Sequence, residues 1–149
     1  HPFSQTIEKQ YAHRTKLFHD PNFLPEFDLQ VMPAVQSVGE NSRTLEYSTW
    51  FEALDHMKAE LSNRSFDVAL IGAGAYGLFL AAECKKMGAI GVHIGGALQL
   101  LFGIKGDRWT NPTTGDSQAV LPHVNEHWVS PSSSERPLGA DKVEDGCYW

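Results

Sequence analysis

The chain has 149 residues, 42% of them hydrophobic and 20% charged, which is typical of one modest globular domain with a buried core. Its net charge of −6, with Lys85-Lys86 as an isolated basic pair, argues against a nucleic-acid surface. No apolar stretch approaches the roughly 18 residues of a membrane span and no signal peptide is visible, so we expect a cytoplasmic protein. Cys84 and Cys147 fit neither a disulfide framework nor a metal site.

The first residues predict a helix that Ser4 caps, with apolar positions at Ile7, Tyr11, Leu17 and Phe18. In a parallel sheet such a helix normally follows a strand in the chain. We therefore expect residues 1–3 to be the tip of a truncated strand, and the chain to be the C-terminal part of a longer protein.

Three further elements are expected before residue 62. In residues 29–35 the apolar side chains alternate loosely, as in a strand. Pro33 indicates that this strand lies at an edge of the sheet or ends early. A loop follows at 39–42. Thr49 and Glu52 form a capping box that begins a helix through about Leu61.

The most informative stretch, residues 66–109, repeats a strand, a glycine turn and a helix twice. It predicts strands at 68–71 and 90–94 and helices at 76–87 and 97–102. The alternation is typical of an α/β protein, and we expect a Rossmann-like, three-layer parallel sheet over residues 1–109 in which the two strands are neighbours.

In a parallel sheet the ligand binds at the carboxyl ends of the strands, where these glycine turns lie. Their backbone N–H groups, with polar side chains nearby, are suited to a phosphate-bearing ligand. The candidate nucleotide- or phosphate-binding residues are Gly72, Gly74, Tyr76, Gly77, Gly95, Gly96, Gln99, Lys105 and Arg108. The candidate catalytic bases are His1, His93 and His127, because histidine titrates near neutrality.

The glycines leave three interpretations open. Gly72, Gly74 and Gly77 match the dinucleotide fingerprint, but no acidic residue follows at the end of the second strand to hold a ribose. The protein is therefore an NAD(P)-dependent oxidoreductase, or its glycines serve packing alone, or it binds a different phosphate-bearing ligand.

Residues 110–149 form an irregular tail rich in proline and serine, with aromatic islands at 125–128 and 147–149. Large aromatic side chains are uncommon in disordered segments. We expect the tail to pack over the carboxyl-end cleft, with Glu126, His127 and Trp128 near the glycine turns as a lid. A flexible tail is the alternative.

Several segments resemble bacterial glycosyltransferases of the GT-D fold type, in their C-terminal half. The resemblance covers nearly the whole chain and is carried by residues 1–3, 24–27, 34–36, 50–54, 71–77, 95–109 and 144–149. It implies a Rossmann-like domain that transfers a sugar from a UDP- or GDP-type nucleotide-sugar donor to a glycan acceptor in surface-glycan synthesis.

The related transferases hold Mn²⁺ or Mg²⁺ through an acidic motif early in the protein, and this chain has no counterpart. Asp141 and Glu144 lie in the tail with different spacing. If the motif lies upstream, the resemblance implies that this chain alone is inactive. Otherwise the protein is a non-catalytic nucleotide- or sugar-phosphate-binding module.

Overall fold

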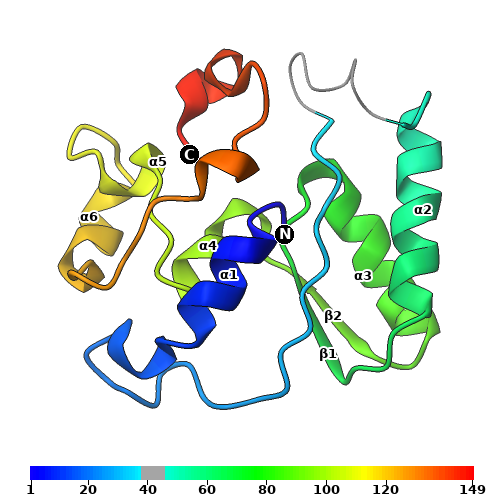
Figure 1. Cartoon of the computed structure of the whole chain (residues 1–149), viewed down its shortest axis with the longest axis horizontal. Helices are drawn as coiled ribbons and strands as arrows, with labels where there is room; N and C mark the ends of the chain where they lie inside the picture. Colours follow the sequence, from blue (N-terminus) through cyan, green and yellow to red (C-terminus); the bar gives the residue numbers. More distant parts are fainter. Residues whose placement is uncertain (38–45) are drawn as a thin grey trace.

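A computed structural model describes residues 1–37 and 46–149, and the loop predicted at 39–42 lies outside them. The fold is α/β (Figure 1): two parallel strands, β1 (Val68–Ile71) and β2 (Ile90–His93), lie among helices. β1 pairs with β2 in the register Val68↔Ile90 to Ile71↔His93. The predicted parallel pairing of neighbouring strands is thus confirmed.

Helix α3 (Gly77–Lys86), entered through the 3₁₀ turn η3 (Gly74–Tyr76), connects the two strands and packs on one face of them. The approach is close, because a Cβ built on Gly91 would lie 2.8 Å from the Cα of Ala81. Helix α2 (Trp50–Ser62) packs on α3 in turn. The predicted N-cap is confirmed, because Glu52 N donates to Thr49 Oγ1 over 3.2 Å, while the Glu52 carboxylate accepts from Ser48 N over 2.8 Å, one residue before the N-cap.

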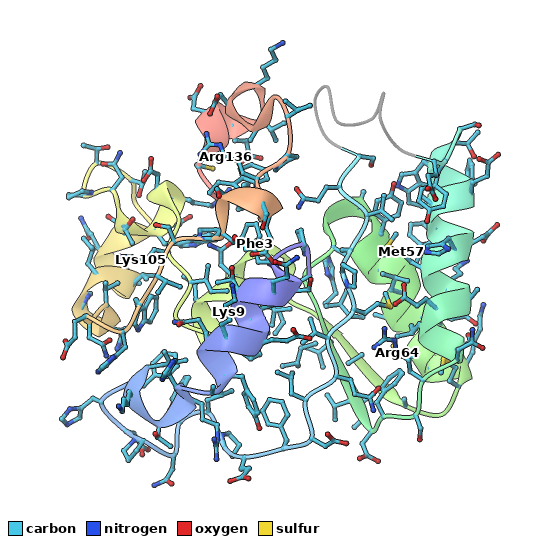
Figure 2. The ribbon with its side chains drawn as sticks, in the orientation of Figure 1. Phe3, Lys9, Met57, Arg64, Lys105 and Arg136 are labelled. Carbon is cyan, nitrogen blue, oxygen red and sulfur yellow. The ribbon has the colours of Figure 1, made fainter. Side chains whose placement is uncertain are left out.

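Two hydrophobic cores lie on different sides of the strands. The α2–α3 core has Met57 at its centre (Figure 2) and includes Ile71, Tyr76 and Leu80. The α1–α4 core gathers apolar side chains of α1 (Ser4–Tyr11), α4 (Leu98–Leu101) and the segments next to them. Its fully buried members are Phe3, Leu17 and Ile104.

Helix α1 ends at Tyr11, and a separate 3₁₀ turn, η1 (Arg14–Lys16), precedes Leu17. The predicted capping by Ser4 is wrong: Phe3 is the N-cap residue, and no side chain caps from that position. Instead Glu135 of the tail accepts from Gln5 N over 2.8 Å and Thr6 N over 3.3 Å, and also from the Thr6 hydroxyl.

Residues 29–35 are extended but form no strand, contrary to expectation. Their backbone pairs with the first residue of the chain: His1 N donates to Met32 O over 3.2 Å, and Ala34 N donates to His1 O over 3.3 Å. Pro33 has no N–H to offer a ladder, and β1 pairs only with β2 among the described residues.

The three-layer sheet that we expected is not formed by residues 1–37 and 46–149. In these residues β1 and β2 pair only with each other, and one of their two faces lacks a covering layer. α3 covers one face, whereas on the other face Val68, Leu70, Ile90 and Val92 are 38–60% exposed. No helix in these ranges is both long and apolar enough to cross a membrane.

The tail contains only short helical elements, as its composition indicates. They are α5 (Asp107–Thr110), α6 (Ser117–Val120), η5 (Leu121–His123), η6 (Ser133–Glu135), η7 (Ala140–Lys142) and η8 (Glu144–Gly146). The turn η4 (Gly95–Ala97) leads into α4 before them.

The tail docks its aromatic side chains as predicted, but in a different place. Trp128 is 4% exposed and donates from Nε1 to Leu17 O over 2.7 Å, beyond the C-terminal end of α1. The predicted lid of residues 126–128 is therefore misplaced. The tail residue that contacts a glycine turn is Tyr148, against Gly96.

Candidate functional site

Two glycine turns meet at the carboxyl end of the sheet. A Cβ built on Gly72, after β1, would lie 2.6 Å from the carbonyl oxygen of Gly95, after β2. It would also lie 2.3 Å from Cδ2 of His1. Because Gly72 has no side chain, the turn after β1 can pack directly against Gly95 and His1.

His1 is held at this junction by its backbone and its ring. Its Nδ1 accepts from Phe3 N over 3.1 Å, and burial lowers the pKa of its α-amino group to about 6. His1 thus closes one side of the junction between the two turns.

The turns contain two glycines of a different kind. Gly74 and Gly95 have φ values of +50° and +69°, which side chains rarely tolerate, and a Cβ on either would meet nothing within 4 Å. Unlike Gly72, these two glycines combine a left-handed backbone with open space around the position of a Cβ. They are the positions that a ligand can approach.

His93 ends β2 with its ring over Gly77, where an added Cβ would lie 2.1 Å from Cε1 and from Nδ1. Its Nδ1 lies 3.2 Å from Ile71 O. A carbonyl oxygen only accepts, so this contact assigns the hydrogen to Nδ1 and leaves the lone pair on Nε2. The Nε2 of His93 can therefore accept a hydrogen bond at the carboxyl end of the sheet.

Beside the β2 turn lies a pocket of about 520 Å³, which we call the β2 pocket. Its lining comes from the β2 turn, α4, α5, α6 and the C-terminal segment. The lining residues used below are Ile94, Gly96, Arg108, Trp109, Asp116 and Tyr148.

Two aromatic rings pack against Gly96 and form a wall of this pocket. A Cβ on Gly96 would lie 2.7 Å from the Tyr148 ring and 3.3 Å from the Trp109 ring. The two rings meet edge to face, with centroids 5.6 Å apart. The pocket thus has an aromatic wall directly beside the glycine turn.

Arg108 is the cation of the β2 pocket, and it is already paired. It donates to Asp116 over 3.1 Å, to Glu144 over 3.0 Å and to the Tyr148 hydroxyl over 2.8 Å. The hydrogen bond to Asp116 and the charges nearby raise the pKa of Arg108, and burial raises the pKa of Tyr148. The site therefore presents a fixed guanidinium among carboxylates and a neutral phenol.

The remaining predicted site residues lie elsewhere. Tyr76 is buried, stacks on Trp50 with centroids 5.0 Å apart, and places its hydroxyl 2.9 Å from Ser37 Oγ. Lys105 lies between α4 and α5 (Figure 2) and donates from its backbone N–H to Val129 O over 2.7 Å. His127 lies beside Trp128, and its ring is 3.8 Å from the Glu126 carboxylate.

Gln99 does not line the β2 pocket, but it contacts Tyr148, which does. It is fully buried and donates from Nε2 to Ile104 O over 3.2 Å and to Tyr148 O over 3.3 Å. It therefore holds the C-terminal segment in place as a positioning residue.

Sequence reasoning missed Asp116 and the pairing of Glu144 with Arg108, because no fixed spacing links a carboxylate in a loop to a distant arginine. It singled out residues 147–149 as an aromatic island, without placing Tyr148 on Gly96.

Mn²⁺ and Mg²⁺ prefer several oxygen ligands in one place. In residues 1–37 and 46–149 no group of three or more His, Cys, Asp or Glu side chains is arranged for a metal ion. The carboxylates of Asp116 and Glu144 are both directed at Arg108. These residues do not fit a divalent cation, and we assign no step to one.

Comparison of the chain with family models, curated proteins and solved structures gives no match in any of the three.

Proposed function

We propose that the β2 pocket binds the nucleotide part of a UDP- or GDP-type sugar donor, and that the chain is a glycosyltransferase-type domain acting on a glycan acceptor. One observation carries the proposal: a single pocket of about 520 Å³ unites a glycine turn after a parallel strand, an arginine, a carboxylate and two aromatic rings. That volume lies within the range of small-molecule sites.

The chemistry of the lining matches the parts of such a donor. Arg108 offers a charged donor to a phosphate, and the open backbone of Gly95 directly precedes Gly96, which lines the same pocket. Asp116 can accept hydrogen bonds from ribose or sugar hydroxyls. Trp109 and Tyr148 offer ring surfaces to a base. A pocket with both signs of charge suits a ligand that carries both phosphates and hydroxyls.

His93 is the base that we assign to the acceptor hydroxyl. Its Nε2 keeps a lone pair, and His93 directly precedes Ile94, which lines the β2 pocket. The proposal also includes the larger Rossmann-like sheet. The parallel β1–β2 pair and the α3 connection support it.

Thermal unfolding with added ligands tests the proposal. A ligand at 100 times its Kd adds about 2.7 kcal/mol to the free energy of unfolding. We expect UDP, GDP or their sugars to raise the melting temperature. Stabilisation that does not depend on Mn²⁺ or Mg²⁺ is compatible with a non-catalytic binding module, and stabilisation by NAD(H) alone would instead indicate an oxidoreductase.

A matched pair of variants locates the binding site. Arg108→Gln should abolish the shift caused by the nucleotide, because it removes the only cation that lines the β2 pocket in the described residues. Arg14→Gln is the control: Arg14 also pairs with a carboxylate, Glu26, but at η1. Equal shifts in the two variants would place any nucleotide outside this pocket.

A further inference from the structure

A second cavity of about 520 Å³, which we call the β1 slot, lies along the edge of β1 that β2 does not use. One wall is β1 itself, and the opposite wall is the extended segment 27–32 with Ala34. Figure 1 shows this segment running beside β1, between α1 and the α2–α3 pair. The slot therefore separates two roughly parallel stretches of backbone.

The slot also separates the two hydrophobic cores. Leu61, Ile71 and Leu80 of the α2–α3 core line it, and so do Ile7 and Phe102 of the α1–α4 core. A strand within a parallel sheet has both faces covered and is apolar on both. The lining of the slot matches that requirement.

Backbone groups of β1 face the slot without a strand partner. In a parallel ladder alternate N–H and C=O groups point to the two sides of a strand. The described residues give β1 a partner on the β2 side alone. Val68 and Leu70, which also line the slot, are 50% and 38% exposed on the face of β1 that α3 does not cover.

Both ends of the slot are defined. At the amino end of β1, Gln30 donates to Ser65 O over 3.0 Å and Arg64 (labelled in Figure 2) donates to Val31 O over 3.2 Å, so side chains join the two walls. At the carboxyl end, His1 reaches across from Gly72 to Met32.

His1 already forms the last rung of a parallel ladder with the far wall. Its N–H donates to Met32 O, and its C=O accepts from Ala34 N. This pattern, in which one residue bonds to the residues on either side of its neighbour, is that of parallel strands. Burial disfavours the charged α-amino group at this position, as its lowered pKa of about 6 indicates.

We propose that the β1 slot is the seat of one further β-strand: an apolar segment that runs parallel to β1, hydrogen-bonds to its free edge and is joined by a peptide bond to the α-nitrogen of His1. The direction follows from the geometry, because His1 lies at the carboxyl end of β1. β1 has four residues, so a strand of about that length spans the slot. Its side chains would join the two cores.

The test adds the strand to the chain. Val-Ile-Val-Ile-Val fused to His1 should raise the melting temperature by roughly 10 °C over the same chain extended by Gly-Ser-Gly-Ser-Gly. Hydrogen exchange at the β1 amides that face the slot should slow by on the order of 100-fold. Equal melting temperatures and equal exchange in the two fusions would overturn the proposal.

A matched pair of substitutions shows where the strand binds. Leu70→Glu places a charge in the slot, whereas Val92→Glu places one on the register partner of Leu70, which is similarly exposed but does not line the slot. The gain from the apolar extension should disappear with Leu70→Glu and persist with Val92→Glu. Loss in both or in neither would contradict binding in the slot.

Two further arms distinguish other occupants. The pentapeptide added as a separate molecule should stabilise the unextended chain far less than the fusion does, and equal stabilisation would indicate a separate partner. Light scattering should find the unextended chain monomeric. A dimer with protected β1 amides would mean that a second copy fills the slot, and would overturn the proposal.

Discussion

At the scale of single residues, the glycines of the two turns have different roles that their sequence pattern does not reveal. Three of them leave room for a ring to pack against the backbone: His1 packs at Gly72, His93 at Gly77 and Tyr148 at Gly96. Gly74 and Gly95 adopt positive φ and face open space. A match to a glycine motif therefore mixes packing positions with positions that a ligand can reach.

Substitution of Gly72 tests the packing role. The Cβ of Gly72→Ala would meet the Gly95 carbonyl oxygen at 2.6 Å, and neighbouring backbone cannot yield as a flexible side chain can. We expect a loss of about 1–3 kcal/mol in the free energy of unfolding, the usual cost of overpacking. Chemical denaturation measures it.

The control for this prediction is Gly115→Ala. Gly115 has open space around its missing Cβ and no positive φ, so the substitution should change the stability by less than about 0.5 kcal/mol. If both variants unfold at the same denaturant concentration, the contact between the two turns contributes nothing to stability.

At the scale of elements, local signals predicted what depends on neighbours in the chain. The capping box of Thr49 and Glu52 located the start of α2, and apolar runs bounded by glycines located β1 and β2. Residues 29–35 form no strand because a strand needs a partner strand. Within residues 1–37 and 46–149, the hydrogen bonds between backbone groups found for this segment go to His1 alone. The cap of α1 was missed because Glu135 is 130 residues away from Gln5.

Glu135 offers the sharpest test at this scale. It is 7% exposed, and its carboxylate serves two backbone N–H groups and a hydroxyl of α1. Glu135→Ala leaves these donors without their partner, which costs about 1–3 kcal/mol. Exchange of the amide hydrogens in the first turn of α1 should accelerate in parallel.

The matched control is Glu126→Ala. The Glu126 side chain is 84% exposed and approaches only the His127 ring, at 3.8 Å, among the contacts described. Exposed pairs of this kind contribute little to stability. Similar melting temperatures for the two variants would show that α1 does not depend on the tail.

At the scale of the whole molecule, the tail joins parts of the fold that are distant in sequence. Glu135 holds the start of α1, Trp128 packs at Leu17 beyond the C-terminal end of α1, and Tyr148 forms a wall of the β2 pocket. The composition of the tail indicated that its aromatic side chains would dock. Their positions depend on the shape of the surface that receives them, so the lid expected at residues 126–128 was misplaced, and Tyr148 is the tail residue that contacts Gly96.

Trp128 shows how strongly the tail is attached. Its ring is 4% exposed, lies edge to face with Phe18 at a centroid distance of 5.8 Å and donates to Leu17 O. Trp128→Ala should cost about 3–5 kcal/mol, a large part of the 5–15 kcal/mol typical of a domain. The tail should then be cleaved faster in limited proteolysis, while Phe51→Ala, which truncates a ring that is 71% exposed, should leave both stability and cleavage nearly unchanged. If Trp128→Ala retains the melting temperature and cleavage pattern of the parent chain, the tail is held by its other contacts, because the loss of this one buried ring would then release nothing.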